Sequence, residues 1–309
     1  MIKLGILGNG KILNEIIPEI EMTGRYEIVV GGVRNPEKTK IFEEKGIPTV
    51  VGYENVINNN EVEVVYIVLI NSLHYEYAKM ALEAGKHVIL EKPLVSSLNQ
   101  AQELFEIAEK NNVYLFEAMT VHHNPNYKKI KEYKDEIKMI NLVIAQKSSR
   151  LDNLRKNIID NVFNPKLEGG AMRDMGVYAI NFIYGLLGKA KNVEYIPQIH
   201  ENGVDLGGQI IFKYQAKSAV VTLSKIMGTH YHITILGDDL LIKSDDMVST
   251  LYDLEINGEK FKSEGVYRYE FEYFYQMLTD FDAEKYLYHK EMSLEEVKLL
   301  EDIYQKLGI

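Results

Sequence analysis

Lys92 is the residue whose type and position most clearly suggest chemistry. It follows the apolar run 87–90 and Glu91, and it precedes Pro93. In an open parallel sheet, ligands bind at the carboxyl ends of the strands. Because proline restricts the preceding residue to extended backbone conformations, a lysine held at a strand end is a candidate site residue. The alternative is a solvated surface lysine, which is the commoner case.

Two further polar residues, Asp174 and Tyr178, lie in an otherwise apolar segment that begins after Gly169-Gly170. Residues four apart share one face of a helix, and burying an acid and a phenol is costly unless they have partners. A neighbouring Lys92 ammonium would favour the phenolate, which suits a general acid/base acting on an alcohol oxygen. Without Lys92, the pattern indicates an acid at a helix N-terminus and an ordinary half-buried tyrosine.

The N-terminal segment predicts a dinucleotide-binding turn. An apolar run over residues 2–7 is followed at once by Gly8-Asn9-Gly10 and then by a helical pattern from Lys11. Glycines there allow a tight turn, so that a pyrophosphate can sit on the N-terminus of the helix. The third small residue of the usual motif falls on Leu13, which weakens it. A glycine turn of another kind of α/β protein is the alternative.

The end of the second predicted strand indicates the cofactor. Sites for NAD place an acid about 20 residues past the glycines, whereas arginine accommodates the 2′-phosphate of NADP. Here the strand runs into Gly31-Gly32-Val33-Arg34-Asn35, without an acid at its tip. We therefore expect Arg34 to bind the extra phosphate, with Asn35 as a helper, and NADP to be preferred. Alternatively, Arg34 lies over the adenine, as arginine does in sites of either preference.

Several motifs recur in a fixed order along the chain. They are Gly8-x-Gly10, Val64–Ile67, 71–74, 81–88, 91–93 and 169–178. In this order they resemble the glucose–fructose oxidoreductase, inositol dehydrogenase and rhizopine-catabolism family (Gfo/Idh/MocA). With tyrosine at position 178, the chain resembles the dihydrodiol dehydrogenase branch of this family. The resemblance implies an N-terminal Rossmann domain, a C-terminal α+β domain built on an open, mainly antiparallel sheet, and a nicotinamide cofactor between them.

The resemblance also implies site residues. Lys92, Asp174 and Tyr178 would form the catalytic set. The implied cofactor-binding residues are Gly8, Asn9, Gly10, Lys11, Ile12, Arg34, Asn35, Ile70, Asn71, His74, Glu91 and Lys92. The cofactor would be NADP or NAD, and the substrate a sugar, polyol or small diol. Tyr178 would take the hydroxyl proton, Lys92 would stabilise the charge, and Asp174 would orient the substrate or the lysine. Which of Lys92 and Tyr178 accepts the proton first stays open.

Three residues depart from the family pattern. Leu13 replaces a small residue, Ile70 stands where relatives often carry proline, and His122 stands where they usually carry an arginine that shapes the substrate pocket. A histidine titrates near neutrality, so His122, His123 and Asn124 are candidate substrate residues. Two adjacent histidines without a third ligand make a poor zinc site, and we expect no metal.

Composition favours a soluble enzyme. A chain of 309 residues, 46% of them hydrophobic, is long enough for two domains, which we expect at 1–118 and 119–309. A formal charge of −10 disfavours nucleic acid and anionic membranes. The sequence lacks cysteine, an apolar membrane span and a signal-peptide pattern, so we expect a cytoplasmic protein.

Organisation along the chain follows the same plan. Strands alternate with helices up to about residue 117, and Pro18 is expected to end or kink the first helix. Beyond Gly188 the chain predicts successive strands, including 193–199, 205–214 and 230–236, and then a helical tail over 267–307. The solvent face of such a sheet is a natural surface for a homodimer or homotetramer.

Two other functions stay open at this level. A dinucleotide-sensing regulatory protein could keep the fold without catalysis, although it would not need Lys92, Asp174 and Tyr178 together. Carbon–halogen or glycosidic chemistry through transient oxidation is conceivable from family relatives, but no residue indicates it.

Overall fold

The computed structural model describes residues 1–308 and divides the chain into two compact units. The first unit combines residues 1–118 with 267–297, and the second comprises residues 119–266 and continues from Lys298. The division predicted from the sequence, 1–118 and 119–309, assigned the whole tail to the second domain. In the structure, residues 267–297 instead pack with the first unit.

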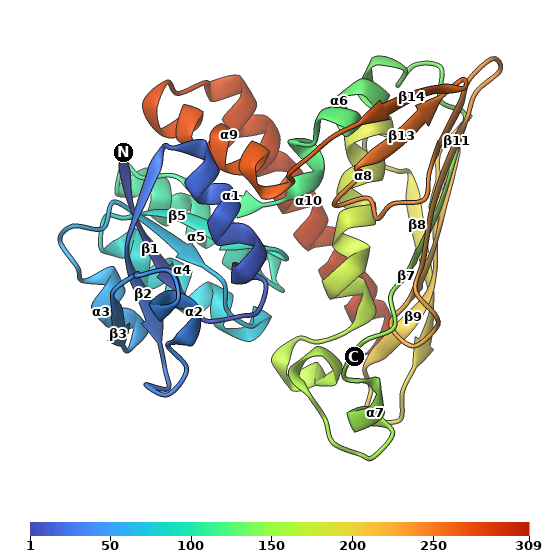
Figure 1. Cartoon of the computed structure of the whole chain (residues 1–309). Helices are drawn as coiled ribbons and strands as arrows, with labels where there is room; N and C mark the ends of the chain where they lie inside the picture. The colour runs from blue at the N-terminus through green and yellow to red at the C-terminus, as the bar shows by residue number, and fades with distance from the viewer. Residues whose placement is uncertain (309) are drawn as a thin grey trace. The chain divides into compact units, whose positions relative to one another are not determined.

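The first unit is built on a six-stranded sheet in the order β3-β2-β1-β4-β5-β6, with all strands parallel (Figure 1). The strands are β1 (Ile2–Leu7), β2 (Tyr26–Val33), β3 (Thr49–Val51), β4 (Val64–Ile67), β5 (His87–Glu91) and β6 (Leu115–Ala118). This is the order of the Rossmann fold, in which ligands bind at the carboxyl ends of the strands where the order reverses. The predicted α/β fold is confirmed.

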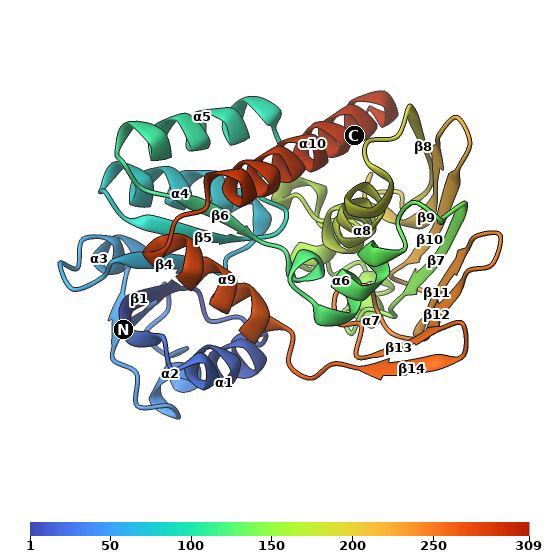
Figure 2. The same ribbon diagram turned by 90° about the horizontal axis from the view of Figure 1, so that it is seen from above.

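Helices cover both faces of this sheet (Figure 2). Apolar residues of α1 (Leu13–Thr23), α2 (Lys40–Glu43) and α9 (Tyr267–Thr279) form one core with the strands. Those of α3 (Tyr53–Ile57), α4 (His74–Glu83) and α5 (Leu98–Lys110) form the core on the other face. Neighbouring residues of a strand alternate between the two cores, as Val65 and Tyr66 do, because successive side chains of a strand point to opposite faces.

Aromatic residues explain why the chain returns to the first unit. Phe271 and Phe274 of α9 are buried among the strands, and the Tyr26 hydroxyl donates to the Phe271 carbonyl at 2.8 Å. Further along the chain lies α10 (Ala283–Leu307). The hydroxyl of its residue Tyr286 accepts a hydrogen bond from the Leu115 N–H at 3.4 Å. The predicted helical tail is therefore present, but its first part completes the core of the first unit.

Helix α1 contains Pro18 and does not end there. It continues to Thr23 and ends at Gly24, which adopts the left-handed conformation (φ 62°). Ile17 and Ile20 on either side of the proline are fully buried. Burial of both side chains offsets the backbone hydrogen bond that proline removes.

The second unit is built on an eight-stranded sheet in the order β14-β13-β12-β11-β7-β10-β9-β8. Only β7 and β10 pair in parallel among these neighbours, so the predicted open, mainly antiparallel sheet is confirmed. The strands are β7 (Met139–Ala145), β8 (Asn192–Ile199), β9 (Asp205–Lys213), β10 (Ser218–Ser224), β11 (His230–Leu236), β12 (Leu241–Ser244), β13 (Asp253–Ile256) and β14 (Glu259–Lys262). The last two were not predicted because they are short and carry many charged residues.

Helices α6 (Pro125–Glu132) and α8 (Val177–Leu187) lie on one face of this sheet, as Figure 1 shows. Shorter elements are α7 (Leu151–Leu154), a π-helical turn (Met172–Gly176), and 3₁₀ helices at Asn71–Leu73, Thr120–His122, Asn161–Phe163 and Pro165–Leu167. Strand residues facing the helices are buried, for example Val221 and Phe212, whereas Val220 and Ile211 on the opposite face are half-buried. The sheet therefore has one core face and one partly apolar outer face.

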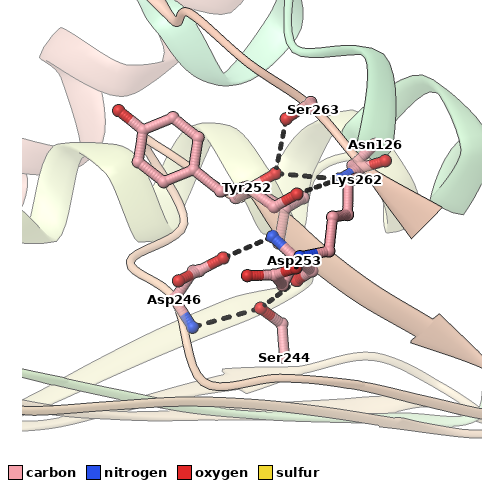
Figure 3. A network of polar contacts seen from close by, with 8 residues as sticks. Asn126, Ser244, Asp246, Tyr252, Asp253, Lys262 and Ser263 are labelled. Carbon is pink, nitrogen blue, oxygen red and sulfur yellow. Dashed lines mark hydrogen bonds and ion pairs between the residues drawn. The ribbon is translucent and has the colours of Figure 1, made fainter. Parts of the chain in front are cut away.

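A polar network holds the loop between β12 and β13 (Figure 3). The Asp253 N–H donates to Asp246 Oδ2 at 2.6 Å, and the Ser244 hydroxyl donates to the Asp253 carbonyl at 2.6 Å. From α6, the Asn126 amide donates to the Tyr252 carbonyl at 3.0 Å, and the Ser263 N–H donates to the same carbonyl at 2.7 Å. These bonds tie the outermost strands to α6.

Candidate active site

The turn after β1 has the geometry of a dinucleotide-binding turn. Gly8 has φ +112°, and a Cβ there would lie 2.2 Å from the Val68 carbonyl oxygen, so only glycine is tolerated. The Gly8 N–H donates to the Gly32 carbonyl at 3.0 Å. Gly10 has open space beside it, with the nearest atom at 3.8 Å. Lys11 and Ile12 are exposed and lead into α1, whose N-terminus favours an anion. The turn fits a pyrophosphate.

The loop after β2 carries the residues predicted to select the cofactor. Arg34 is exposed, and its guanidinium carbon lies 6.0 Å from the centroid of the Tyr53 ring. Asn35 Oδ1 accepts from the Glu37 N–H at 2.9 Å and so shapes the loop. The Asn9 side-chain amide donates to the Lys38 carbonyl at 3.0 Å. Asn9 thereby joins the glycine turn to the Arg34 loop.

The segment after β4 shows why Ile70 can replace proline. Its backbone angles are φ −75° and ψ 149°, the conformation that proline would impose, and Asn71 then begins a 3₁₀ turn. His74 is fully buried, with Nδ1 2.9 Å from the Pro93 carbonyl oxygen and Nε2 3.2 Å from that of Leu69. These contacts place His74 between the segments that follow β4 and β5.

Glu91 and Lys92 lie where the sequence predicted them, at the carboxyl end of β5. The Tyr66 hydroxyl donates to Glu91 Oε1 at 2.5 Å. Burial raises the pKa of Glu91, while the Tyr66 hydrogen bond and the charge of Lys92 act to lower it. The peptide bond between Lys92 and Pro93 is cis. Lys92 is thus placed beside a carboxyl that is itself held by a buried tyrosine.

Two further buried acids in the first unit were not predicted as site residues. Glu117 in β6 accepts from the Leu94 N–H at 2.8 Å. Burial raises the pKa of Glu117 to about 7, with a smaller contribution from Glu91, and Lys92 acts to lower it. Glu270 in α9 is fully buried, and burial followed by the charge of Glu91 raises its pKa well above the usual range. Lys92 therefore adjoins a group of carboxyls whose pKa values are all raised by burial.

In the second unit, Asp174 and Tyr178 lie at the start of the helix that the sequence predicted. Asp174 sits in the π-helical turn, and Tyr178 is the second residue of α8. A Cβ at Gly176 would lie 2.4 Å from Met172 Sδ, so this glycine permits the close turn. Single π-helical turns of this kind are frequent at functional sites. Asp174 forms an ion pair with Lys225, a residue that the sequence did not single out.

A buried aspartate fixes the beginning of that turn. Asp205 Oδ2 accepts from the Met172 N–H at 2.8 Å and from the Tyr195 hydroxyl at 2.9 Å. Its other oxygen accepts from the Tyr304 hydroxyl at 2.8 Å. Gly170 has φ +136°, and a Cβ there would lie 2.1 Å from Asp205 Oδ1. Asp205 therefore holds the chain immediately before Asp174.

The candidate substrate residues 122–124 are buried. His122 Nε2 lies 2.8 Å from Asn181 Oδ1, and burial lowers the pKa of His122 to about 4. The expectation that His122 titrates near neutrality is therefore wrong, because desolvation disfavours the charged ring. Asn124 caps α6: its side-chain oxygen accepts from the Asn126 N–H at 2.8 Å, and its amide donates to the Thr250 carbonyl at 2.7 Å.

Among residues 1–308, no group of three or more His, Cys, Asp or Glu side chains could hold a metal ion. None of the helices in the same range is both long enough and apolar enough to cross a membrane.

The strand order of the first unit and its glycine turn define a dinucleotide-binding protein of the Rossmann class. Two family models match the chain: "Oxidoreductase family, NAD-binding Rossmann fold" over residues 2–119, and "GFO/IDH/MocA C-terminal domain" over residues 137–243. The chain therefore belongs to the Gfo/Idh/MocA family, as its motifs predicted.

Individual relatives agree with this assignment. The chain is 28% identical to scyllo-inositol 2-dehydrogenase (NADP(+)) of Bacillus subtilis (strain 168), over 100% of this chain and 98% of that protein. It is 29% identical to trans-1,2-dihydrobenzene-1,2-diol dehydrogenase of Xenopus tropicalis, over 74% of this chain and 70% of that protein. In fold it is similar to a 3-ketoreductase from Actinomadura kijaniata in complex with NADP and TDP-benzene, with a TM-score of 0.85 at 23% identity, covering 98% of this chain and 97% of that one.

Family membership decides between the functions left open by the sequence. The chain is an enzyme, an NAD(P)-dependent dehydrogenase or reductase, rather than a dinucleotide sensor. Its cofactor is a nicotinamide dinucleotide.

Proposed function

We propose that this enzyme interconverts a hydroxyl and a carbonyl on a sugar, polyol or small diol, with NADP as the preferred cofactor. The observation that carries the proposal is the accessible Asp174 carboxylate one turn before Tyr178, at the head of an otherwise buried helix. A carboxylate accepts hydrogen bonds from substrate hydroxyls. Relatives named as inositol and dihydrodiol dehydrogenases support the substrate class.

The catalytic residues in this proposal are Lys92, Asp174 and Tyr178. When bound, the nicotinamide ring accepts or supplies the hydride. Tyr178 takes the proton of the substrate hydroxyl in the oxidative direction and returns it in the reductive one. The Lys92 ammonium stabilises the negative charge that develops on oxygen, and Asp174 orients a neighbouring substrate hydroxyl. The cofactor-binding residues in the proposal are those of the glycine turn, the Arg34 loop, residues 70–71, His74 and residues 91–92.

A panel of carbonyl substrates tests the reaction. NADPH is incubated with the enzyme and with keto-inositols, aldoses, ketoses, small diketones and simple aliphatic ketones, and oxidation is followed by absorbance. We expect turnover with at least one polyhydroxylated carbonyl compound and little with simple aliphatic ketones. Turnover restricted to simple ketones would contradict the substrate class, and no oxidation with any of them would contradict the proposed reaction.

Cofactor preference follows from Arg34 and from the lack of an acid at the tip of β2. Arg34→Ala is expected to weaken NADPH binding by about 10–100-fold, because a charge-assisted bond to phosphate is lost, and NADH binding by less than about threefold. Fluorescence titration measures both dissociation constants. Arg25→Ala is the matched control, since Arg25 lies over Tyr275 at the opposite end of β2. Equal losses for both cofactors, or a wild type that prefers NADH, would contradict the assignment.

We also propose that the protein forms a homodimer or homotetramer through the outer face of the second sheet. Val220 and Ile211 are paired neighbours on this face and are half-buried, and Val143 on β7 is half-buried as well. Burying the apolar part of such a face against a partner lowers the free energy of the assembly. We propose that a second copy of the chain covers this outer face.

The assembly is tested by light scattering at micromolar concentration. We expect a mass of at least twice the 35.5 kDa of one chain. Val220→Glu places a charge in the centre of the face and is expected to give the monomer mass. Met22→Glu, at an exposed residue of α1, is the control and should leave the assembly intact. A monomeric wild type would rule out this interface.

The remaining proposals concern the environment of the enzyme. We propose a cytoplasmic location, which the absence of cysteine supports. We also propose that the substrate is a small molecule and that neither nucleic acid nor membrane is a partner, which the net charge of −10 supports.

A further inference from the structure

Asp174 is paired with a lysine that the proposed reaction does not use. Lys225 directly follows β10, and its Nζ forms an ion pair with Asp174 Oδ2. The Lys225 side chain is only 5% exposed, whereas that of Asp174 is 41% exposed. A ligand can therefore reach the carboxylate but has little access to the ammonium. Any effect of Lys225 on the substrate must act through Asp174.

The backbone around Lys225 is fixed on both sides. Its N–H donates to the Leu206 carbonyl at 2.8 Å, and its carbonyl accepts from the Ser148 N–H at 2.8 Å. These bonds continue the sheet beyond β10, after which the Ser224 hydroxyl accepts from the Met227 N–H at 3.0 Å and turns the chain. The direction of the Lys225 side chain is set by the sheet.

Asp174 is held equally firmly from its own side. The bond from the Met172 N–H to Asp205 fixes the start of the π-helical turn, and the Arg173 guanidinium lies 3.8 Å over the Tyr304 ring. The ion pair thus joins two rigid pieces of backbone, the end of β10 and the turn before α8. A buried ammonium is costly without a carboxylate partner, so the pair has one favoured arrangement.

We propose that Lys225 is a positioning residue: it holds the Asp174 carboxylate in one orientation, so that Asp174 binds a hydroxyl of the substrate. The proposal rests on the proposed function and deepens it. Of the two roles that the sequence left open for Asp174, orienting the substrate or orienting Lys92, the proposal concerns the first, because the Asp174 side chain is 41% exposed and a substrate hydroxyl can reach it.

Steady-state kinetics test this role. Lys225→Met is expected to raise KM for the polyhydroxylated substrate by about 10–100-fold, the effect of losing a hydrogen bond to a charged group, with kcat changed by less than about threefold. An interaction made equally in the ground and transition states affects KM alone. Lys225→Arg keeps the charge and is expected to recover most of the loss. Lys213→Met is the matched control, since Lys213 forms an exposed ion pair with Glu194 in the same sheet.

The double variant separates positioning from general damage. If Lys225 acts through Asp174, adding Lys225→Met to Asp174→Asn should lower kcat/KM by less than about twofold beyond Asp174→Asn alone. Multiplied losses in the double variant, or an unchanged KM in Lys225→Met, would overturn the proposal. So would a Lys225→Arg variant as impaired as Lys225→Met.

A thermal measurement needs no substrate and stays decisive if the proposed reaction fails. Asp174→Asn leaves the buried Lys225 ammonium without its carboxylate, so its melting temperature should fall below that of the wild type. Lys225→Met then removes the buried charge, and the double variant should melt higher than Asp174→Asn. Melting temperatures that fall additively would show that the two residues are not coupled and would overturn the inference, whatever the substrate panel shows.

Discussion

Tyr178→Phe is expected to lower kcat by about 10²–10⁴-fold, the range for a lost general acid/base. The substitution keeps the ring on α8 and removes only the hydroxyl, so the fold should be unchanged. The dissociation constant for NADPH should change by less than about twofold, because the phenol is assigned to the substrate. Stopped-flow measurement of NADPH oxidation under single-turnover conditions reports the chemical step. Tyr184→Phe removes a hydroxyl from the same helix and is the matched control.

Lys92→Met is expected to lower kcat at least as much, because it removes the cation that stabilises the charge on oxygen. The double variant, Lys92→Met with Tyr178→Phe, should be little worse than the worse single variant, since groups that act as one unit are not additive. Near-normal turnover in Tyr178→Phe, with chemistry shown to limit the rate, would leave the tyrosine a structural role only. Fully multiplicative losses would mean that the two residues act independently.

Asp205→Ala is expected to produce the largest loss of stability. It removes the acceptor for the Met172 N–H and for the Tyr304 hydroxyl, and one of the two acceptors of the Tyr195 hydroxyl, which also reaches the Gly207 carbonyl. Each buried donor left unsatisfied costs about 1–3 kcal/mol, so losing the acceptor of the Met172 N–H and of the Tyr304 hydroxyl should lower the free energy of unfolding by about 2–6 kcal/mol. Urea unfolding followed by circular dichroism measures it. Because the same bonds fix the turn that carries Asp174, kcat/KM should fall as well.

Two milder substitutions show whether the bonds to Asp205 are responsible. Asp205→Asn keeps one side-chain acceptor and should cost less than Asp205→Ala. Tyr195→Phe removes a single donor and should cost about 1 kcal/mol. A loss below about 1 kcal/mol in Asp205→Ala itself would show that the network does not stabilise the second unit.

The sequence predicted those parts of the fold that local patterns determine. The Gly8 turn, the strand 230–236 and the helix carrying Tyr178 each have a contiguous signal, namely glycine between two apolar periodic segments, alternation of side chains, or a run of helix-forming residues. The position of Lys92 at a strand end is predictable for the same reason. For the strands of the second sheet other than β13 and β14, the bounds were predicted to within a residue or two because turns separate them.

What the sequence did not predict depends on partners that are distant along the chain. Lys225, Asp205 and Glu117 each look like an ordinary polar residue in or next to an apolar strand, and only tertiary structure brings them to Asp174, Met172 and Leu94. His122 appeared to be a titrating group, but burial against α8 makes it neutral. Pro18 failed as a helix breaker because its neighbours are buried on both sides.

The first unit is not contiguous in the sequence: its sheet is complete at residue 118, but its aromatic helix begins only at Tyr267. At a synthesis rate of about 5–20 residues per second, Phe271 and Phe274 are made on the order of ten seconds or longer after the last strand of the sheet. In that interval the sheet face that they later cover is exposed on the ribosome. The nascent enzyme should therefore be a better client for chaperones than a protein whose domains are each made in one stretch, and neither domain can be excised by a single cut.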